Sequence, residues 1–214
     1  LYGSNLTWGI VDAWGQVYSM QNAPTDGAGQ AMCKIAKLNF NNSELTPTTD
    51  KMWNAAWNTI ANCNELIQKA ESADSTIFYL GDFERKLILS EAIGLRAYMH
   101  FDLLRIYAPA PAANPGKKTY IPYVNYYPAY VNENISVSEC LEHIIADLKK
   151  AQEALYLLEG KKTTSLSANK RFQQSASGKK LFFALRGYRL NYWATTALLA
   201  RVYLYAGMKE EAYK

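Results

Sequence analysis

Cysteine and histidine are scarce in this sequence, and their placement excludes several kinds of site. The 214 residues include three cysteines and two histidines. Cys33, Cys63 and Cys140 are far apart and odd in number, and no CxxC pair is present, so a structural zinc site is not indicated. Cys63 and Cys140 fall on apolar stripes with helical spacing, where we expect buried free thiols. We therefore expect no bound metal and no cofactor.

Long apolar runs and strong charge of one sign are also missing. No apolar run reaches the roughly 18 residues that a membrane span needs. The formal net charge is only +4. It is concentrated between Glu159 and Arg189, where eight residues are basic and one is acidic. This stretch is rich in serine and is typical of a solvated loop, whereas nucleic-acid-binding chains usually carry a basic stripe on a structured face. Nucleic acid is therefore not an expected partner.

Catalytic motifs are absent as well. The sequence contains no arrangement of Ser, His and Asp typical of a catalytic triad, no glycine-rich phosphate loop and no HExxH motif. Arg96 and His100 lie one helical turn apart and would suit an acid–base pair, but we prefer a buried arginine that binds loop carbonyls. Glu91, Asp102 and Arg105 share one helix face and predict an ion-pair strip. The sequence thus predicts no catalytic residue and no enzyme.

The strongest helical pattern covers Ile88–Tyr107. Two stripes along this helix are apolar, and only a third strip is polar or small. A helix that is apolar on most of its circumference needs neighbours on several sides, so we predict the central helix of the fold. Asp82 is predicted as its N-cap and Pro109 as its stop. Gly94 and Ala97 mark where a neighbouring backbone could approach. The two apolar stripes are Ile88, Ala92, Leu95, Met99, Leu103 and Ile106, and Leu89, Ile93, Ala97, Phe101, Leu104 and Tyr107.

Further helices are predicted on either side. Thr49 is predicted to cap a helix on which Asn64 interrupts an apolar stripe, and we expect its amide to bind a loop backbone group. A capping box from Ser136 to Glu139 opens another helix. Residues 192–205 form a third, which ends at Gly207. The stripe around Asn64 consists of Trp53, Trp57, Ile60 and Ile67.

The remaining segments predict long irregular loops. Residues 1–21 contain an amphipathic helix. Residues 22–49 read as a surface loop with at most one short helical turn at 30–37. Residues 108–134 include five prolines and predict an extended, aromatic-bearing connection. Residues 159–187 predict a polar loop with one apolar island at 181–185, a candidate short strand.

The last helices show a repeat signature. Leu199, Ala200, Tyr203, Gly207 and Ala212 occupy the spacing of a tetratricopeptide unit, in which small residues let paired helices approach while the tyrosine fills the groove. Earlier helix pairs fit this pattern less well. We therefore predict an all-α fold of diverged tetratricopeptide-like helix pairs with long loops.

Several motifs in order resemble one known family. WNAAWNTIANCNELI is followed by SEAIGLRAYMHFDLLRIYAPAP, the YIPYV segment, SVSECLEHIIADLKKA and RLNYWATTALLARVYLYAG. Together they are similar to the N-terminal, tetratricopeptide-bearing region of the SusD/RagB family, nutrient-binding surface lipoproteins of Bacteroidetes. The resemblance covers residues 1–214, which we interpret as one N-terminal helical domain without the family's C-terminal ligand-binding part. The chain opens on Leu1 and stops at Lys214 within a helix pair, so we expect a processed or truncated piece.

The resemblance implies a non-catalytic protein at the extracellular face of the outer membrane. Such proteins capture glycans, or peptides in some members, and deliver them to a SusC-like TonB-dependent transporter. They are held in the membrane by a lipid on an N-terminal cysteine, which this chain lacks. In the starch-binding type, tryptophans shortly follow a Thr-Asp pair. Here residues 27–32, directly after Thr25-Asp26, include no aromatic residue, which argues against starch. Asp26, Gln30 and Lys34 remain candidates for binding sugar hydroxyls.

Tyrosines in the extended segment are the other candidate ligand contacts. Tyr126 and Tyr127 could stack on a sugar ring, although for this group we prefer contact with the transporter or the missing domain. Two alternatives remain: a tetratricopeptide adaptor that binds a peptide, and a glycan-processing enzyme. The long loops argue against the adaptor, because adaptors usually have regular repeats with short loops. The other tyrosines of the segment are Tyr120, Tyr123 and Tyr130.

Overall fold

The computed structural model of the chain is all-α, as the apolar periodicity predicts. It describes residues 9–19, 27–38, 43, 45–160 and 185–214. The backbone divides into two compact units, residues 1–58 and 59–214, and each is described by itself. Within the described ranges, no helix combines the length and apolar character that crossing a membrane would take.

The first unit contains α1 (Ile10–Trp14), α2 (Gly27–Ala36) and the start of α3 (Thr46–Ser72). The helix predicted within residues 1–21 is shorter than expected, because Gln16 adopts a φ of 58° that a helix cannot contain, and Val17 beyond it is exposed. Conversely, α2 has ten residues where only a short turn was predicted. The Gln16 side-chain amide donates a hydrogen bond to the carbonyl of Ala36 at 2.5 Å and links these two helices.

Helix α3 begins three residues before the predicted cap. Pro47 lies in its first turn, where proline is tolerated because the missing N–H would have no helical partner. Thr49 is therefore already helical, and its hydroxyl donates to the carbonyl of Thr46 at 2.9 Å. The prediction of Thr49 as N-cap is wrong, because a proline near a helix start does not prevent an earlier beginning.

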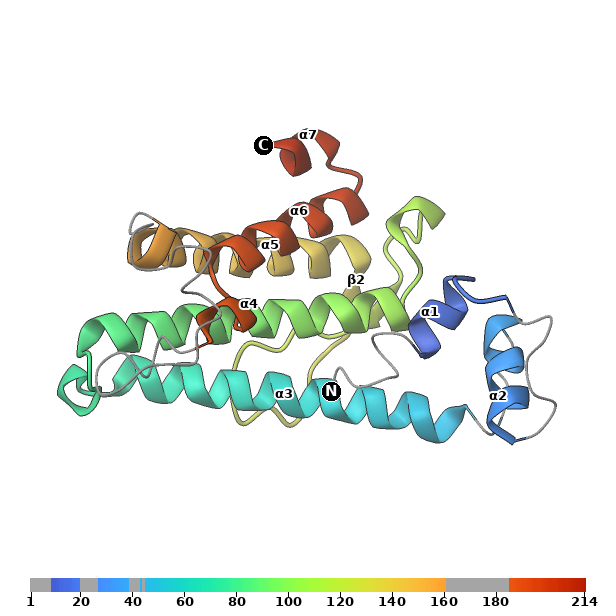
Figure 1. Cartoon of the computed structure of the whole chain (residues 1–214), viewed down its shortest axis with the longest axis horizontal. Coiled ribbons are helices and arrows are strands. Elements are labelled where there is room, and N and C mark those ends of the chain that lie inside the picture. Colours follow the sequence, from blue (N-terminus) through green and yellow to red (C-terminus); the bar gives the residue numbers. More distant parts are fainter. Residues whose placement is uncertain (1–8, 20–26, 39–42, 44, 161–184) are drawn as a thin grey trace. The chain divides into compact units, whose positions relative to one another are not determined.

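The second unit is built around α4 (Asp82–Tyr107). Figure 1 shows α4 between the C-terminal half of α3 and α5 (Val137–Leu155). Ile67 from α3, Ile93 from α4 and Ala151 from α5 meet in one buried cluster. The central position predicted for this helix is confirmed.

The ends of α4 lie close to their predicted positions. The N-cap is Gly81, with a φ of 61°, rather than Asp82. Asp82 is instead the first helical residue, and its carboxylate accepts a hydrogen bond from Arg85 Nε at 2.9 Å. The helix ends at Tyr107, two residues before Pro109, as predicted.

Gly94 marks a close approach of side chains rather than of a backbone. A Cβ at this position would lie 2.5 Å from Cδ2 of Leu190 and 3.5 Å from Cβ of Ala151. The neighbouring Leu95, predicted to belong to an apolar stripe, is 37% exposed, so this position of the stripe is not covered. The close packing predicted at Gly94 is thus present, with two side chains as the neighbours.

Helix α5 begins with the predicted capping box. Ser136 Oγ accepts the N–H of Glu139 at 3.3 Å, and the Glu139 carboxylate accepts the N–H of Ser136 at 2.9 Å. A π-helical turn, Tyr156–Gly160, follows the C-terminus of α5. The predicted apolar island at 181–185 lies outside the described residues, except for Leu185.

Helices α6 (Tyr192–Tyr205) and α7 (Lys209–Tyr213) form the pair predicted at the end of the chain. Gly207, with a φ of 80°, lies at the corner between them, where a residue with a Cβ would be strained. Leu199 and Tyr203 are buried on α6. The assignment of this pair to a tetratricopeptide repeat stays a prediction.

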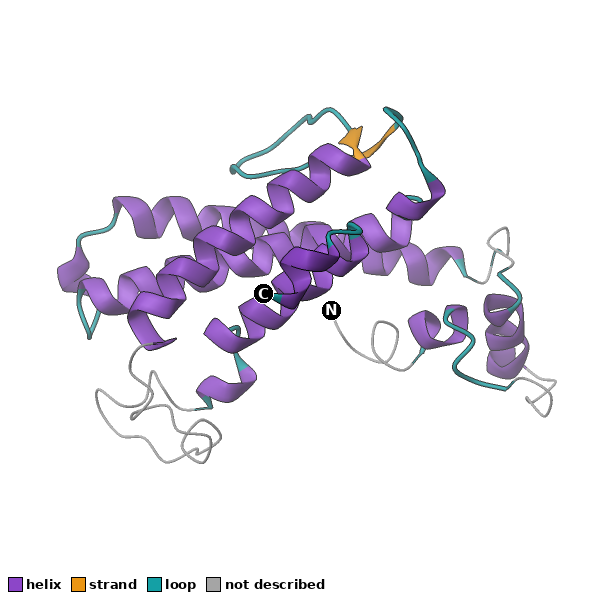
Figure 2. Ribbon diagram, turned by 90° about the horizontal axis from the view of Figure 1, so that it is seen from above, coloured by secondary structure: helices purple, strands orange, loops and turns teal. Residues whose placement is uncertain are grey.

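Two short strands complete the described structure of the second unit. β1 (Thr119–Ile121) and β2 (Ile135–Ser136) are antiparallel, with Thr119 opposite Ser136 and Ile121 opposite Ile135. They close the loop of residues 122–134 at its base, which Figure 2 shows as the long teal segment beside the orange strands. Among the described residues, short 3-10 turns occur at Ser75–Ile77, Pro111–Ala113 and Arg186–Tyr188.

Candidate functional site

The loop between the two strands, residues 122–134, carries a group of exposed aromatic side chains, and we call it the aromatic loop. Tyr126 and Tyr127 are 43% and 42% exposed, and Tyr130 and Val131 are 88% and 85% exposed. The Tyr126 hydroxyl donates a hydrogen bond to Asn132 Oδ1 at 3.0 Å. Exposed tyrosines combine an apolar ring with a polar hydroxyl, which suits contact with a partly polar ligand.

Asn64 on α3 holds the start of the aromatic loop. Its side-chain Nδ2 donates to the carbonyls of Val124 and Tyr126 at 3.1 and 3.2 Å, and the side chain is completely buried. Its Oδ1 accepts a hydrogen bond from Arg96 at 2.9 Å. The prediction that this amide binds loop backbone is confirmed.

Arg96 on α4 binds the same loop from a second side. It donates to the carbonyl of Asn125 at 3.2 Å, and its Nε and Nη2 form a two-pronged pair with Asp147 of α5 at 2.8 and 2.9 Å. Burial alone would lower the pKa of Arg96, but its hydrogen bonds and charge pairing with Asp147 outweigh this and raise the pKa. The prediction of a buried arginine that binds loop carbonyls is confirmed.

His100, one turn further along α4, is the third side chain that binds the loop. We call Asn64, Arg96 and His100 the anchors of the aromatic loop. Its Nε2 accepts the N–H of Val124 at 3.0 Å, so the proton is on Nδ1, which donates to the carbonyl of Arg96 at 2.9 Å. The Tyr123 ring stacks between His100 and His143, with centroid distances of 4.1 and 4.9 Å. Its hydroxyl donates to Asp147 at 2.5 Å. Both nitrogens of His100 thus bind backbone groups, which leaves neither to act as an acid or base on a substrate.

Together, three buried side chains bind four of the six backbone polar groups of residues 124–126. The N–H and carbonyl of Val124, and the carbonyls of Asn125 and Tyr126, are all held by Asn64, Arg96 or His100. Backbone fixed in this way loses little further freedom when a ligand binds. The anchors therefore present Tyr126 and its neighbours in one preset arrangement.

The anchoring by His100 predicts an acid-sensitive fold. Burial, followed by the charge of Arg96, lowers the pKa of His100 to about 4, from about 6.5 in an unfolded chain. The unfolded state therefore binds a proton first, and stability is complete above pH 6.5 and declines until pH 4. The loss reaches about 3 kcal/mol, because each pKa unit corresponds to about 1.4 kcal/mol.

Urea denaturation followed by circular dichroism between pH 4 and 8 measures this decline. In His100→Gln, which lacks the titrating group but keeps a side-chain hydrogen-bonding group, we expect a flatter curve over the same range. An equally steep decline in the variant would assign the acid sensitivity to other groups.

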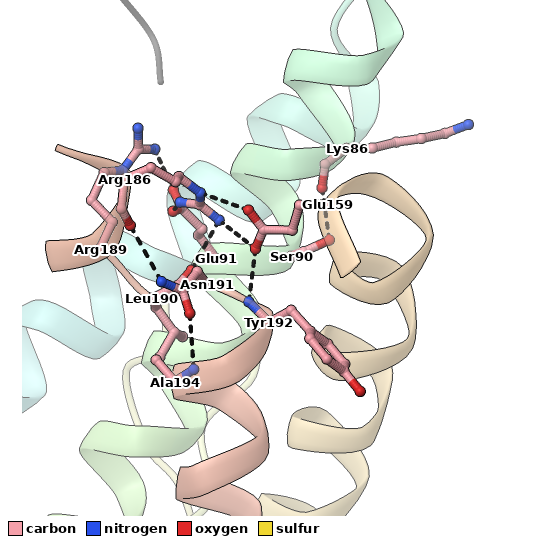
Figure 3. A network of polar contacts seen from close by, with 10 residues as sticks. All are labelled: Lys86, Ser90, Glu91, Glu159, Arg186, Arg189, Leu190, Asn191, Tyr192 and Ala194. Atoms are coloured by element: carbon pink, nitrogen blue, oxygen red, sulfur yellow. Dashed lines mark hydrogen bonds and ion pairs between the residues drawn. The ribbon is translucent and has the colours of Figure 1, made fainter. Parts of the chain in front are cut away.

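A second buried polar network includes Glu91 of α4, five residues before Arg96 (Figure 3). Arg186 is completely buried and forms a two-pronged pair with Glu159 at 2.9 and 3.0 Å. Arg186 also pairs with Glu91 of α4, which Arg189 binds as well. The N–H of Tyr192 donates to Glu159 at 2.7 Å. The prediction that Glu91 joins an ion-pair strip with Asp102 and Arg105 is therefore wrong for Glu91, because its partners come from another segment; Asp102 and Arg105 do pair, at 2.5 Å.

This second network is structural in character. The network connects the π-helical turn after α5 with the turn before α6. Next to it, the Asn191 side chain caps α6 by accepting the N–H of Ala194 at 2.9 Å. Burial raises the pKa of Glu159, against the opposing effects of the Tyr192 N–H and Arg189, and burial lowers the pKa of Arg186. The charges of the two carboxylates and two guanidinium groups balance, so we assign the network to stability rather than to ligand binding.

The candidate residues predicted from sequence fall into different parts of the chain. Tyr126 and Tyr127 are exposed in the aromatic loop of the second unit. Lys34 is half-buried on α2 of the first unit, and Gln30 lies on the same helix. Asp26 lies outside the described residues. The structure therefore brings together the tyrosines, with Tyr130 as an additional member.

The main partner of Arg96 escaped the sequence analysis. Asp147 of α5 pairs with Arg96, and it accepts the hydroxyl hydrogen bond of Tyr123 at the start of the aromatic loop. It lies on a helix with many other polar residues, so its sequence position carries no signal of the loop that it helps to hold.

Two cysteines, Cys63 and Cys140, lie on helices of the second unit. Cys63 and Cys140 are buried free thiols, as predicted, and burial raises their pKa values to about 11 and about 12. Thiols with such pKa values are unreactive near neutral pH. Over the ranges that the structure covers, no group of three histidine, cysteine, aspartate or glutamate side chains could hold a metal ion.

Comparison with known proteins identifies the fold and the family. Residues 5–177 match the SusD-like family described as starch-binding and associating with the outer membrane. Similar solved structures include a SusD superfamily protein from Bacteroides thetaiotaomicron, which is 27% identical, with 75% of this chain and 29% of that chain covered and a TM-score of 0.52. A SusD-like carbohydrate binding protein from Bacteroides vulgatus is 20% identical, with the same coverage and a TM-score of 0.53.

A SusD-like protein from Bacteroides fragilis is 18% identical, with 95% of this chain and 35% of that chain covered and a TM-score of 0.55. The chain thus spans about a third of the length of these structures. A comparison with curated proteins finds no match. Because the family match extends over most of the sequence, this chain belongs to the SusD-like family of starch-binding, outer-membrane-associated proteins.

Proposed function

We propose that this chain captures a glycan through the aromatic loop and does not cleave it. Members of the SusD-like family are binding proteins. The observation that carries the proposal is the group of exposed tyrosines on a loop whose first part, residues 124–126, is held by Asn64, Arg96 and His100. Sugar rings have apolar C–H faces that pack on aromatic rings and hydroxyls that bind polar groups at the border.

The cellular setting is part of the same proposal. The protein would act at the extracellular face of the outer membrane, held by a lipid anchor, and would pass its ligand to a SusC-like TonB-dependent transporter. In this setting residues 1–214 are the N-terminal helical domain of a longer chain with a further C-terminal ligand-binding part. The family's association with the outer membrane supports this setting.

Affinity gel electrophoresis against a panel of polysaccharides, with a parallel assay for released sugars, tests the proposal. We expect one or more polysaccharides to retard the chain with no product formed. Product release would contradict a role in capture alone. Failure of every polysaccharide to retard the chain, together with stable association of the aromatic loop with purified transporter, would favour the alternative that the loop is a protein contact.

Replacing Tyr126 and Tyr127 together by alanine is expected to weaken glycan binding at least tenfold. Each substitution removes an aromatic face, and a tenfold loss corresponds to about 1.4 kcal/mol. Tyr156→Ala is a matched control, because Tyr156 is equally exposed, at 42%, but lies on the π-helical turn. Binding constants from gels with graded polysaccharide give the comparison; equal losses in the control and the double variant would contradict a specific role for the loop.

A further inference from the structure

A separate groove lies at the N-terminal end of α5. Its volume is about 340 Å³, near the lower end of the range for ligand pockets. Three segments form it: residues 111–116 after α4, the first turns of α5, and the corner between α6 and α7. None of these segments belongs to the aromatic loop or its anchors.

The groove has an apolar floor and a polar border. Val137 and Leu141 are buried at its floor, and Met208 contributes a partly exposed side wall. Asn114 and Glu142 supply an amide and a carboxylate at the border. No hydrogen bond or ion pair joins either side chain to another residue in the described part of the chain, so both are available to a ligand.

The charge of the groove argues for a neutral ligand. Glu142 is the only charged residue among those that line it. The N-terminus of α5 would normally attract an anion, but the Glu139 carboxylate already binds Ser136 there, through its N–H at 2.9 Å and its hydroxyl at 2.6 Å. An acidic ligand would therefore meet a carboxylate without gaining the helix N-terminus.

We propose that this groove binds one ring of a neutral sugar, as a second contact for a captured glycan. This inference rests on the proposed function. A pyranose places its C–H face on the apolar floor, while its edge hydroxyls donate to the Glu142 carboxylate and exchange hydrogen bonds with the Asn114 amide. The groove accordingly favours neutral sugars over uronic acids, because Glu142 repels a second carboxylate.

The methyl group of Met208 offers a direct probe of the groove. The full chain, with ¹³C-labelled methionine methyl groups, is titrated with maltotriose, cellotriose, mannotriose, trigalacturonic acid and tri-lysine. We expect at least one neutral trisaccharide to shift the Met208 signal, while the signals of buried Met52 and Met99 stay in place as internal controls. A shift caused equally by trigalacturonic acid, or by tri-lysine alone, would overturn the proposal.

Variants at Glu142 separate the groove from the aromatic loop. Glu142→Ala is expected to weaken binding of the responsive trisaccharide about tenfold, whereas Glu142→Gln keeps an acceptor and gains binding of trigalacturonic acid. Glu153→Ala, also exposed on α5, is the control. If polysaccharides retard the chain but no trisaccharide shifts Met208, the groove proposal fails and glycan capture stands; if nothing binds by either method, both fail.

Discussion

Replacing Arg186 by methionine is expected to destabilise the second unit by about 3–5 kcal/mol. Arg186 is completely buried and is the partner shared by Glu91 and Glu159. Its removal leaves two largely buried carboxylates without their shared partner, and Arg189 contacts only Glu91 in compensation. An uncompensated buried charge costs far more than the intact pair contributes, so we expect a large loss of stability.

Urea denaturation followed by circular dichroism at 222 nm measures the loss. Arg85→Met is the control, because Arg85 pairs with a half-exposed Asp82 and we expect a much smaller effect there. The combined variant Glu91→Leu, Glu159→Leu, Arg186→Met should recover most of the stability, since a buried polar network can be replaced by apolar side chains of similar volume. A loss below about 1 kcal/mol for Arg186→Met would contradict the assigned role.

Replacing Arg96 by methionine is expected to have a similar cost and an additional effect on the aromatic loop. The substitution leaves Asp147, which lies largely buried, without its guanidinium partner, and removes the donor to Asn125. We expect a loss of about 3–5 kcal/mol. The loop should also lose its preset arrangement, so glycan binding should weaken in conditions where the chain is still folded.

Arg96→Lys distinguishes charge from geometry. A lysine keeps the attraction to Asp147 but cannot form the two-pronged pair and bind Asn125 at the same time. We expect this variant to recover part of the stability and little of the glycan binding. Denaturation curves and affinity gels on the same samples make the comparison. If Arg96→Met were destabilised while glycan binding by the folded fraction stayed unchanged, the link between the anchor and the binding surface would be wrong.

Part of the fold and of the candidate site could be predicted from the sequence, because local patterns determine local structure. Asn64 stands out as a polar residue on an apolar stripe, and Arg96 as a charge on a helix that must be buried; both observations predict hydrogen bonds to loop backbone, and both are confirmed. The capping box at Ser136 and the pair formed by α6 and α7 are likewise local signals that the structure confirms.

Partners distant in the sequence could not be predicted in this way. Asp147, the main partner of Arg96, is 51 residues away and lies on a helix with many other polar residues. Glu91 was assigned to neighbours on its own helix, but it binds Arg189 at a separation of 98 residues. Such pairs depend on how α4, α5 and the turn before α6 pack, which no periodicity within one segment encodes.

Glycan binding on the aromatic loop should slow the exchange of its backbone amides. Hydrogen–deuterium exchange of the full chain, with and without a polysaccharide that retards it, measures this effect. We predict slower exchange at residues 125–132 in the presence of the glycan, with additional protection at 111–116 if the groove is also occupied. Retardation by the polysaccharide with unchanged exchange across residues 122–134 would contradict binding on the aromatic loop and place the glycan elsewhere on the chain.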